Sequence, residues 1–180
     1  MLNVVTSGTW TGVSNANLPG LTGVGTDKIK WGDVPYDVKS GYAFAGSATT
    51  APLDGTDFLL GELTHYNYTI PLPDEWQFWV NLEVNVFFEE AGTNKTIPLH
   101  FRHEETPNQS AHPHDTVQIP HFKKDDVLYL PEGTYGVEIT GFWVGTGSNK
   151  IKSPDFDVPE GGSRKAGIFA SIKKVKAPGS

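Results

Sequence analysis

Cysteine is absent from the chain, so no disulfide can stabilise it. A protein of this kind that works outside the cell must depend on its hydrophobic core or on a bound metal. Long apolar runs are also missing, because none approaches the roughly 18 residues that suggest a membrane-spanning helix. The N-terminal stretch MLNVVTSGTW lacks the charged start of a signal peptide. We therefore expect no insertion into a membrane.

Basic residues are scarce as well. The sequence has 14 Lys and Arg against 21 Asp and Glu, which gives a formal net charge of −7. Surfaces that bind nucleic acid gather Lys and Arg against the phosphates, and an acidic chain is poorly suited to that task. We therefore expect no nucleic acid among the partners.

Turn-forming and aromatic residues are abundant instead. The 180 residues include 20 Gly and 13 Pro, and aromatic side chains make up 12%. This mixture is typical of an all-β protein, because aromatic residues favour strands while Gly and Pro favour the turns between them. The length corresponds to one domain with a sizeable core. Met1 stands directly before a strand-like segment, so we expect 1–180 to be a single domain cut from a larger protein. The last four residues are equally compatible with an interdomain linker and with a remnant of cloning.

Apolar residues alternate with polar ones along much of the chain, which is the pattern of half-buried strands. The clearest case is 78–88, and 97–101 continues the pattern after a turn at 91–94, so these segments are predicted to form a hairpin. The other predicted strands are 4–13, 27–31, 42–45, 58–70, 116–119, 127–130, 134–144 and 166–175. About ten strands separated by such turns predict a two-sheet, jelly-roll-like β-sandwich with little helix. The segment 154–164 is predicted to be a loop.

The segment 58–70, FLLGELTHYNYTI, contains the most informative polar pair. His65 and Asn67 are two residues apart in a predicted strand, so their side chains share one face of the sheet. The pair could contact a ligand or a metal. It could equally form hydrogen bonds to a neighbouring loop and fix the position of the strand. Both roles combine if the pair orients nearby metal ligands.

A polar, proline-broken segment, HEETPNQSAHPHD at 103–115, follows another predicted strand. Four of its residues offer oxygen donors: Glu104, Glu105, Asn108 and Asp115. A strand-borne His/Asn pair near such a segment predicts a polar site on a β scaffold. Asp155 and Asp157 could supply further oxygens, although Asx turns use the same residue type.

Features of a catalytic site are weak. His112, His114 and Asp115 could bind zinc, but the helix-borne pattern of a metalloprotease is absent. There is no cysteine nucleophile, and no serine stands in a strand-to-helix elbow. Glu89 and Glu90 are adjacent in a predicted strand and point to opposite faces, so they cannot flank one glycosidic bond. We therefore predict a protein without catalytic activity.

Three aromatic residues lie on or beside the polar face of the predicted strand 78–88: Trp76, Trp79 and Phe87. Exposed aromatic rings on a sandwich can stack on a sugar or hold a peptide. Packing under a second sheet or a loop is the more ordinary role, and we expect it for Phe87. Trp76, at the start of the strand, is a candidate ligand contact.

A series of short motifs runs in order through nearly the whole chain. They are Gly8-Thr9-Trp10, Trp31-Gly32, Ser40-Gly41-Tyr42, Leu60-Gly61, Thr64-His65-Tyr66-Asn67, Glu105-Thr106-Pro107-Asn108, Asp115, Gly141-Phe142 and Ala170-Ser171-Ile172. In this order they resemble the bacterial family of secreted modules with a Thr-His-x-Asn motif, which includes the "choice-of-anchor K" domains. Residues 64–67 match that motif here.

The resemblance implies an extracellular protein on a bacterial cell surface. Some members of the family are similar to modules of very large calcium-dependent RTX adhesins, which serve cell adhesion and biofilm formation. In such adhesins the module binds the free C-terminus of a partner polypeptide with the help of Ca²⁺. The resemblance therefore implies a peptide-binding module, monomeric within a multidomain chain.

The resemblance carries over His65 and Asn67 from the strand motif, and Glu105, Asn108 and Asp115 from the loop motif. A carboxylate ligand on an acidic protein needs a cation between them, and Ca²⁺ accepts about six to eight oxygen ligands in irregular geometry. The expected ligand contacts are His65, Asn67, Trp76 and His112. The expected calcium ligands are Glu104, Glu105, Asn108, Asp115, Asp155 and Asp157.

Two other functions fit the same architecture. A carbohydrate-binding module would use aromatic rings and Ca²⁺ to hold sugar hydroxyls, so a glycan is the alternative partner to a peptide. A structural spacer of an adhesin would use Ca²⁺ only to stiffen the fold.

Overall fold

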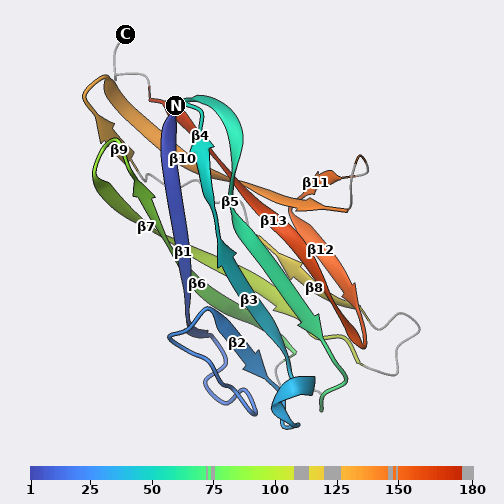
Figure 1. Ribbon diagram of the computed structural model, residues 1–180. Helices are drawn as coiled ribbons and strands as arrows, with labels where there is room; N and C mark the ends of the chain where they lie inside the picture. Colours follow the sequence, from blue (N-terminus) through green and yellow to red (C-terminus); the bar gives the residue numbers. More distant parts are fainter. Residues whose placement is uncertain are drawn as a thin grey trace.

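The chain folds as a sandwich of two antiparallel sheets that pack face to face (Figure 1). The computed structural model describes residues 1–71, 73, 76–107, 114–119, 127–145, 148 and 150–175. Within them there are thirteen strands, so the predicted all-β, two-sheet architecture is confirmed. No helix in these ranges is long and apolar enough to cross a membrane.

The first sheet, here termed sheet A, contains six strands. Their order across the sheet is β12 (Asp155–Pro159), β8 (His114–Gln118), β7 (Thr93–Glu104), β6 (Gln77–Phe88), β1 (Leu2–Val13) and β4 (Ala48–Ala51).

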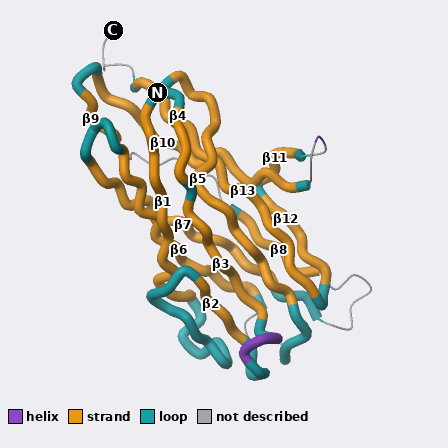
Figure 2. Tube along the Cα trace, viewed as in Figure 1, coloured by secondary structure: helices purple, strands orange, loops and turns teal. Residues whose placement is uncertain are grey.

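The second sheet, sheet B, contains seven strands. Six follow the order β11 (Ile151–Ser153), β10 (Gly133–Val144), β13 (Gly162–Lys174), β5 (Asp54–Asn67), β3 (Ser40–Gly46) and β2 (Lys28–Trp31), and β9 (Val127–Leu130) also pairs with β10. Strands dominate the trace, and the short 3₁₀ helix η1 (Tyr36–Val38) lies between β2 and β3 (Figure 2).

The predicted hairpin is the pair β6–β7. Leu82 pairs with Leu99 and Val84 with Ile97, and these inward side chains are buried. The alternation in the sequence therefore correctly predicts which side chains of both strands point into the core. Phe87 lies on the outer face of β6 and is half-buried.

Three short strands, β4, β11 and β12, lie outside the predicted set, and the prediction of a loop at 154–164 is wrong. This segment contains β12, a turn and the first residues of β13. Phe156 and Val158 of β12 are buried while Asp157 is exposed, so the alternation of a half-buried strand is present. However, β12 is short and is flanked by prolines and aspartates, which are typical of turns. For this reason the sequence does not predict it as a strand.

Aromatic side chains from both sheets pack through the centre of the sandwich. Tyr42 of β3 lies between Trp10 of β1 and Trp31 of β2, with ring centroids 5.5 and 5.3 Å away. Phe101 of β7 also contacts Trp10, at 5.6 Å. All four side chains are fully buried. Beyond this aromatic core, towards the end of β5 and β7, the inward positions become polar.

Candidate functional site

Three buried polar side chains face one another across the sandwich. His65 belongs to β5 of sheet B, whereas His103 of β7 and Asp115 of β8 belong to sheet A. All three are 0% exposed, and the two imidazole centroids are 5.3 Å apart. One potential ligand atom from each residue lies within 4.8 Å of those of the other two. His65, His103 and Asp115 are termed the buried triad below.

The strand period places each member of the buried triad in the interior. His65 follows the buried Leu63 by two positions, and His103 follows Phe101 in the same way. Asp115 precedes the buried Val117 by two positions. Side chains two apart on a strand share a face, so each polar group occupies a position that an apolar residue would normally fill.

Glu105 lies against the buried triad just beyond the end of β7, and it is 3% exposed. Its Oε1 accepts a hydrogen bond from Nε1 of Trp31 at 2.7 Å and lies 3.2 Å from Nε2 of His103. The other ring nitrogen of His103, Nδ1, is hydrogen-bonded to the phenol of Tyr42. The aromatic core therefore holds both Glu105 and His103 in place.

Hydrogen bonds also fix Asp115 and Asn67. The backbone N–H of Thr106 donates to Oδ1 of Asp115 at 2.9 Å. Asn67 is fully buried, and its Nδ2 donates to the carbonyl of Val158 at 2.7 Å. This bond ties β5 of sheet B to β12 of sheet A, which is the positional role that the sequence offered as one alternative for Asn67.

Several buried polar atoms in this region have no hydrogen-bond partner among the described residues. They are Nδ1 and Nε2 of His65, Nε2 of His103, Oδ1 of Asn67, Oδ2 of Asp115 and Oε1 of Glu160. Buried polar groups in native proteins nearly always have a partner in the protein, in ordered water or in an ion. Each neutral imidazole keeps a lone pair on one nitrogen, and together with these oxygen atoms such a group is suited to binding a cation.

Burial keeps the site close to electrical neutrality. It lowers the pKa of His103 to about 4 and that of His65 well below the usual value, with repulsion from His103 adding to the effect on His65. Burial, followed by the charge of Glu105, raises the pKa of Asp115 to about 8. Burial also raises the pKa of Glu105. Without a cation, the site therefore holds neutral imidazoles and a protonated Asp115 at neutral pH.

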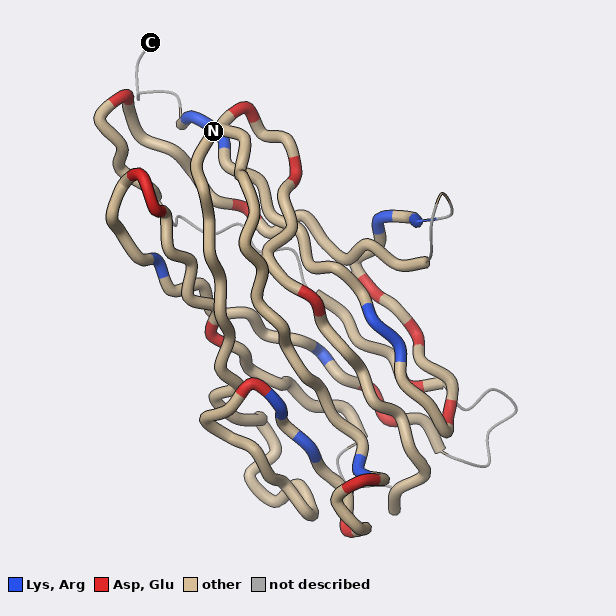
Figure 3. The backbone as a smooth tube through the Cα atoms, in the orientation of Figure 1, with Lys and Arg blue, Asp and Glu red and all other residues tan. Residues whose placement is uncertain are grey.

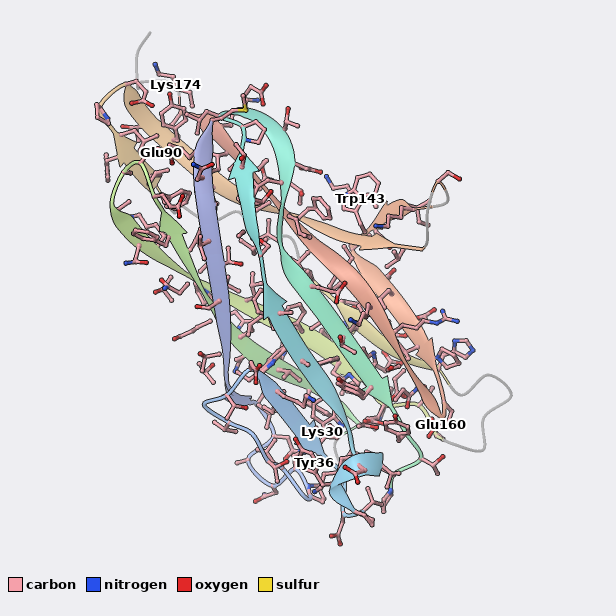
Figure 4. The ribbon with its side chains drawn as sticks, in the orientation of Figure 1. Lys30, Tyr36, Glu90, Trp143, Glu160 and Lys174 are labelled. Carbon is pink, nitrogen blue, oxygen red and sulfur yellow. The ribbon has the colours of Figure 1, made fainter. Side chains whose placement is uncertain are left out.

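A groove of about 960 Å³ lies between β12 of sheet A and the adjoining strands of sheet B. Its lining includes Trp143, Asp155, Asp157, Arg164 and Lys165. Figure 4 shows Trp143 beside β11 and Glu160 at the turn between β12 and β13. This space is termed the outer groove below.

The outer groove borders an unpaired strand edge. The β10–β13 ladder ends at the pair Trp143 and Gly167, so the earlier residues of β13 pair with β5 alone. The neighbouring β12 pairs with β8 of sheet A instead. Within the described part of the chain, the edge of 162–166 that faces β12 therefore has no partner strand. An edge of this kind can accept an added strand.

Asp155 and Asp157 line the outer groove and do not join the buried triad. They alternate with buried residues along β12, so they point to the opposite face of sheet A from Asp115. Oδ1 of Asp155 accepts a hydrogen bond from Ser153 at 3.0 Å. Oδ1 of Asp157 accepts one from Thr116 at 2.8 Å.

The remaining predicted site residues are dispersed. Glu104 points away from the buried triad and accepts a hydrogen bond from Gln77 at 3.1 Å. Trp76 is 44% exposed, and its carbonyl accepts the backbone N–H of Glu105 at 2.8 Å. Asn108 and His112 lie outside the described residues.

Three residues of the region were absent from the predicted site: His103, Tyr42 and Trp31. For His103, the available signal was the inward series at 99, 101 and 103, which brings an imidazole into the core. Tyr42 and Trp31 belong to two of the short motifs that carry the resemblance, but the resemblance assigned them no role at the site. No pattern in the sequence pairs them with the polar site.

No protein-family model matches the chain, and no curated protein matches it.

Proposed function

We propose that the protein is a calcium-dependent ligand-binding module of a bacterial surface adhesin, without catalytic activity. It captures a short extended peptide through the free C-terminal carboxylate of that peptide. The peptide lies in the outer groove, and Ca²⁺ joins its carboxylate to acidic side chains of the protein. The observation that carries this proposal is the outer groove beside an unpaired strand edge.

The shape of the outer groove favours an extended chain. Its volume of about 960 Å³ falls near the upper end of typical ligand pockets. The free edge of 162–166 offers backbone hydrogen bonds, while the groove offers room for side chains. Peptides that add to a sheet edge gain affinity from the backbone and specificity from such pockets.

The charged residues of the outer groove also favour binding of the peptide's C-terminal carboxylate there. Figure 3 shows acidic residues along β12 next to basic residues at the start of β13. Asp155 and Asp157 supply hard oxygen donors for Ca²⁺, and Arg164 and Lys165 line the same groove. Glu105 and Asp115 are too deeply buried to touch a peptide, so the proposal gives them no contact with it.

Calorimetric titration tests the proposal. The metal-free protein is titrated with Ca²⁺, and then with peptides that end in a free carboxylate or in an amide. We expect heat with the free-acid peptides in the presence of Ca²⁺, and none after metal removal. Asp157→Asn is expected to weaken this binding by about tenfold or more, which corresponds to about 1.4 kcal/mol.

Asp33→Asn is the matched control, because Asp33 is exposed and is not among the residues that line the groove. It should bind as the unmodified protein does. Undiminished peptide binding after verified metal removal, or equal binding of the amidated peptides, overturns the proposal.

A carbohydrate-binding module is the second candidate, favoured by two exposed tryptophans. Trp76 and Trp79 are 44% and 40% exposed, and Trp79 lies on the outer face of β6. Flat exposed indole rings stack well on sugars. A glycan array read beside a library of free C-terminal peptides separates the two functions, and a response to glycans alone selects this one.

A further inference from the structure

We propose that the buried triad is a second metal site, distinct from the outer groove, which binds a zinc-class divalent transition metal in the interior of the sandwich. His65 and His103 supply imidazole nitrogens and Asp115 supplies a carboxylate oxygen. The ion joins sheet B to sheet A. This site goes beyond the proposed calcium function and does not depend on it.

The donor set selects the class of metal. Two imidazole nitrogens and one carboxylate oxygen suit Zn²⁺ and its spectroscopic substitute Co²⁺. Ca²⁺ takes oxygen ligands, so it is a poor match for a centre in which two of the three donors are nitrogen. The triad atoms that could ligate lie within 4.8 Å of one another.

The hydrogen bonds leave the donors available. Both nitrogens of His65 and Oδ2 of Asp115 have no partner among the described residues, and both side chains are 0% exposed. Leaving such groups unpaired in the interior is costly, and a cation bound by one nitrogen of His65 and by Oδ2 of Asp115 removes part of that cost. His103 contributes Nε2 when its Nδ1 carries the proton and donates it to the oxygen of Tyr42.

Glu105 lies beside His103, outside the group of three residues whose donor atoms all lie within 4.8 Å of one another. Zinc bonds of about 2.0–2.1 Å in a tetrahedron put neighbouring donor atoms about 3.3 Å apart. Oε1 of Glu105 lies 3.2 Å from Nε2 of His103, close to that spacing. Ionised Glu105 and Asp115 would bring two negative charges into the interior, and a divalent ion balances both.

Neighbouring residues hold His103, Glu105 and Asp115 as metal sites require. Metal-bound imidazoles usually donate their second N–H to a neighbour, and metal-bound carboxylates accept further hydrogen bonds. Tyr42 bonds to His103, Trp31 bonds to Glu105 at 2.7 Å, and Thr106 bonds to Asp115 at 2.9 Å. Each of these partners fixes one donor side chain, and none of them forms a hydrogen bond to a nitrogen of His65.

Visible absorption with Co²⁺ tests the site in the unmodified chain, prepared metal-free and without a polyhistidine tag. We expect one equivalent of Co²⁺ to give the intense d–d bands of four-coordinate cobalt. One equivalent of Zn²⁺ should abolish them, and a large excess of Ca²⁺ should not. Absence of the bands, or their loss with Ca²⁺, overturns the proposal.

Substitution locates the ion. His65→Phe keeps an aromatic ring in the core but removes both nitrogens, and it should abolish the cobalt bands. His100→Phe is the control, because His100 lies on the same strand as His103 but is exposed on the outer face. It should keep the bands. Bands that survive in a folded His65→Phe protein overturn the proposal.

Paramagnetic NMR of the unmodified chain locates the Co²⁺ ion even if the His65→Phe variant fails to fold. In the unmodified chain, Co²⁺ should broaden amide signals most strongly around His65, His103 and Asp115. Broadening centred on His100 or His114 would place the ion on the surface and overturn the proposal. Asp157→Asn should leave the cobalt bands intact, so failure of this site and failure of the calcium function are told apart.

Discussion

Single buried side chains determine how the two sheets are joined near the site. The spacing of His65 and Asn67 predicts a shared face, and the structure places both side chains in the interior. Their contacts differ, however. Asn67 forms a hydrogen bond across the sandwich, while His65 contacts other rings, and neither of its nitrogens has a hydrogen-bond partner among the residues that the structure describes. Spacing in the sequence therefore predicts the face on which a side chain lies, but it does not predict the group to which that side chain bonds.

Asn67→Ala should destabilise the protein by about 1–3 kcal/mol, because it leaves the buried carbonyl of Val158 without its donor. Asn85→Ala is the control: Asn85 is exposed on β6, and its loss should change stability by no more than about 0.5 kcal/mol. Urea unfolding of the two variants measures the difference. Equal midpoints would show that the bond from β5 to β12 does not contribute to stability.

The strands differ in how well the sequence predicts them. The hairpin β6–β7 was predictable because six inward positions of β6 are apolar without interruption. In contrast, β12 offers only Phe156 and Val158 between residues that favour turns. The triad was only partly predictable for a different reason. His65, His103 and Asp115 come from three strands in two sheets, and their meeting depends on long-range pairing that local patterns do not contain.

The contact between β3 and β5 depends on a glycine. A Cβ built at Gly61 would lie 2.3 Å from Cζ of Phe44, so Gly61→Ala forces the ring to move. We expect a loss of about 1–3 kcal/mol, the usual cost of overpacking a core. Gly162→Ala in β13 is the control, because its Cβ would meet nothing within 4 Å. Chemical denaturation measures both.

A second substitution separates steric overlap from any other effect of the added methyl group. In a Phe44→Leu background the smaller side chain gives way, so Gly61→Ala should cost less there than in the unmodified chain. Additive losses in the double variant would contradict the contact, because residues that touch show coupling.

The sandwich is one folding unit because buried side chains of both sheets pack together in a single core. The ladders stabilise each sheet separately, whereas the aromatic core and the buried triad contact both. Tyr42 connects the two sets, since it packs against Trp10 and bonds to His103. Any ion held by the triad would therefore act on the stability of both sheets together.

Zn²⁺ should raise the unfolding temperature while unfolding stays a single transition. An ion that binds only the native state stabilises it by about 2.7 kcal/mol at a free concentration about 100 times its Kd. For a chain of this length, that corresponds to a rise of about 5–10 °C. Because His65 lies in sheet B and His103 in sheet A, hydrogen exchange should slow by similar factors in β5 and in β7. His65→Phe should abolish both effects, and protection confined to one sheet would show that the ion does not join them.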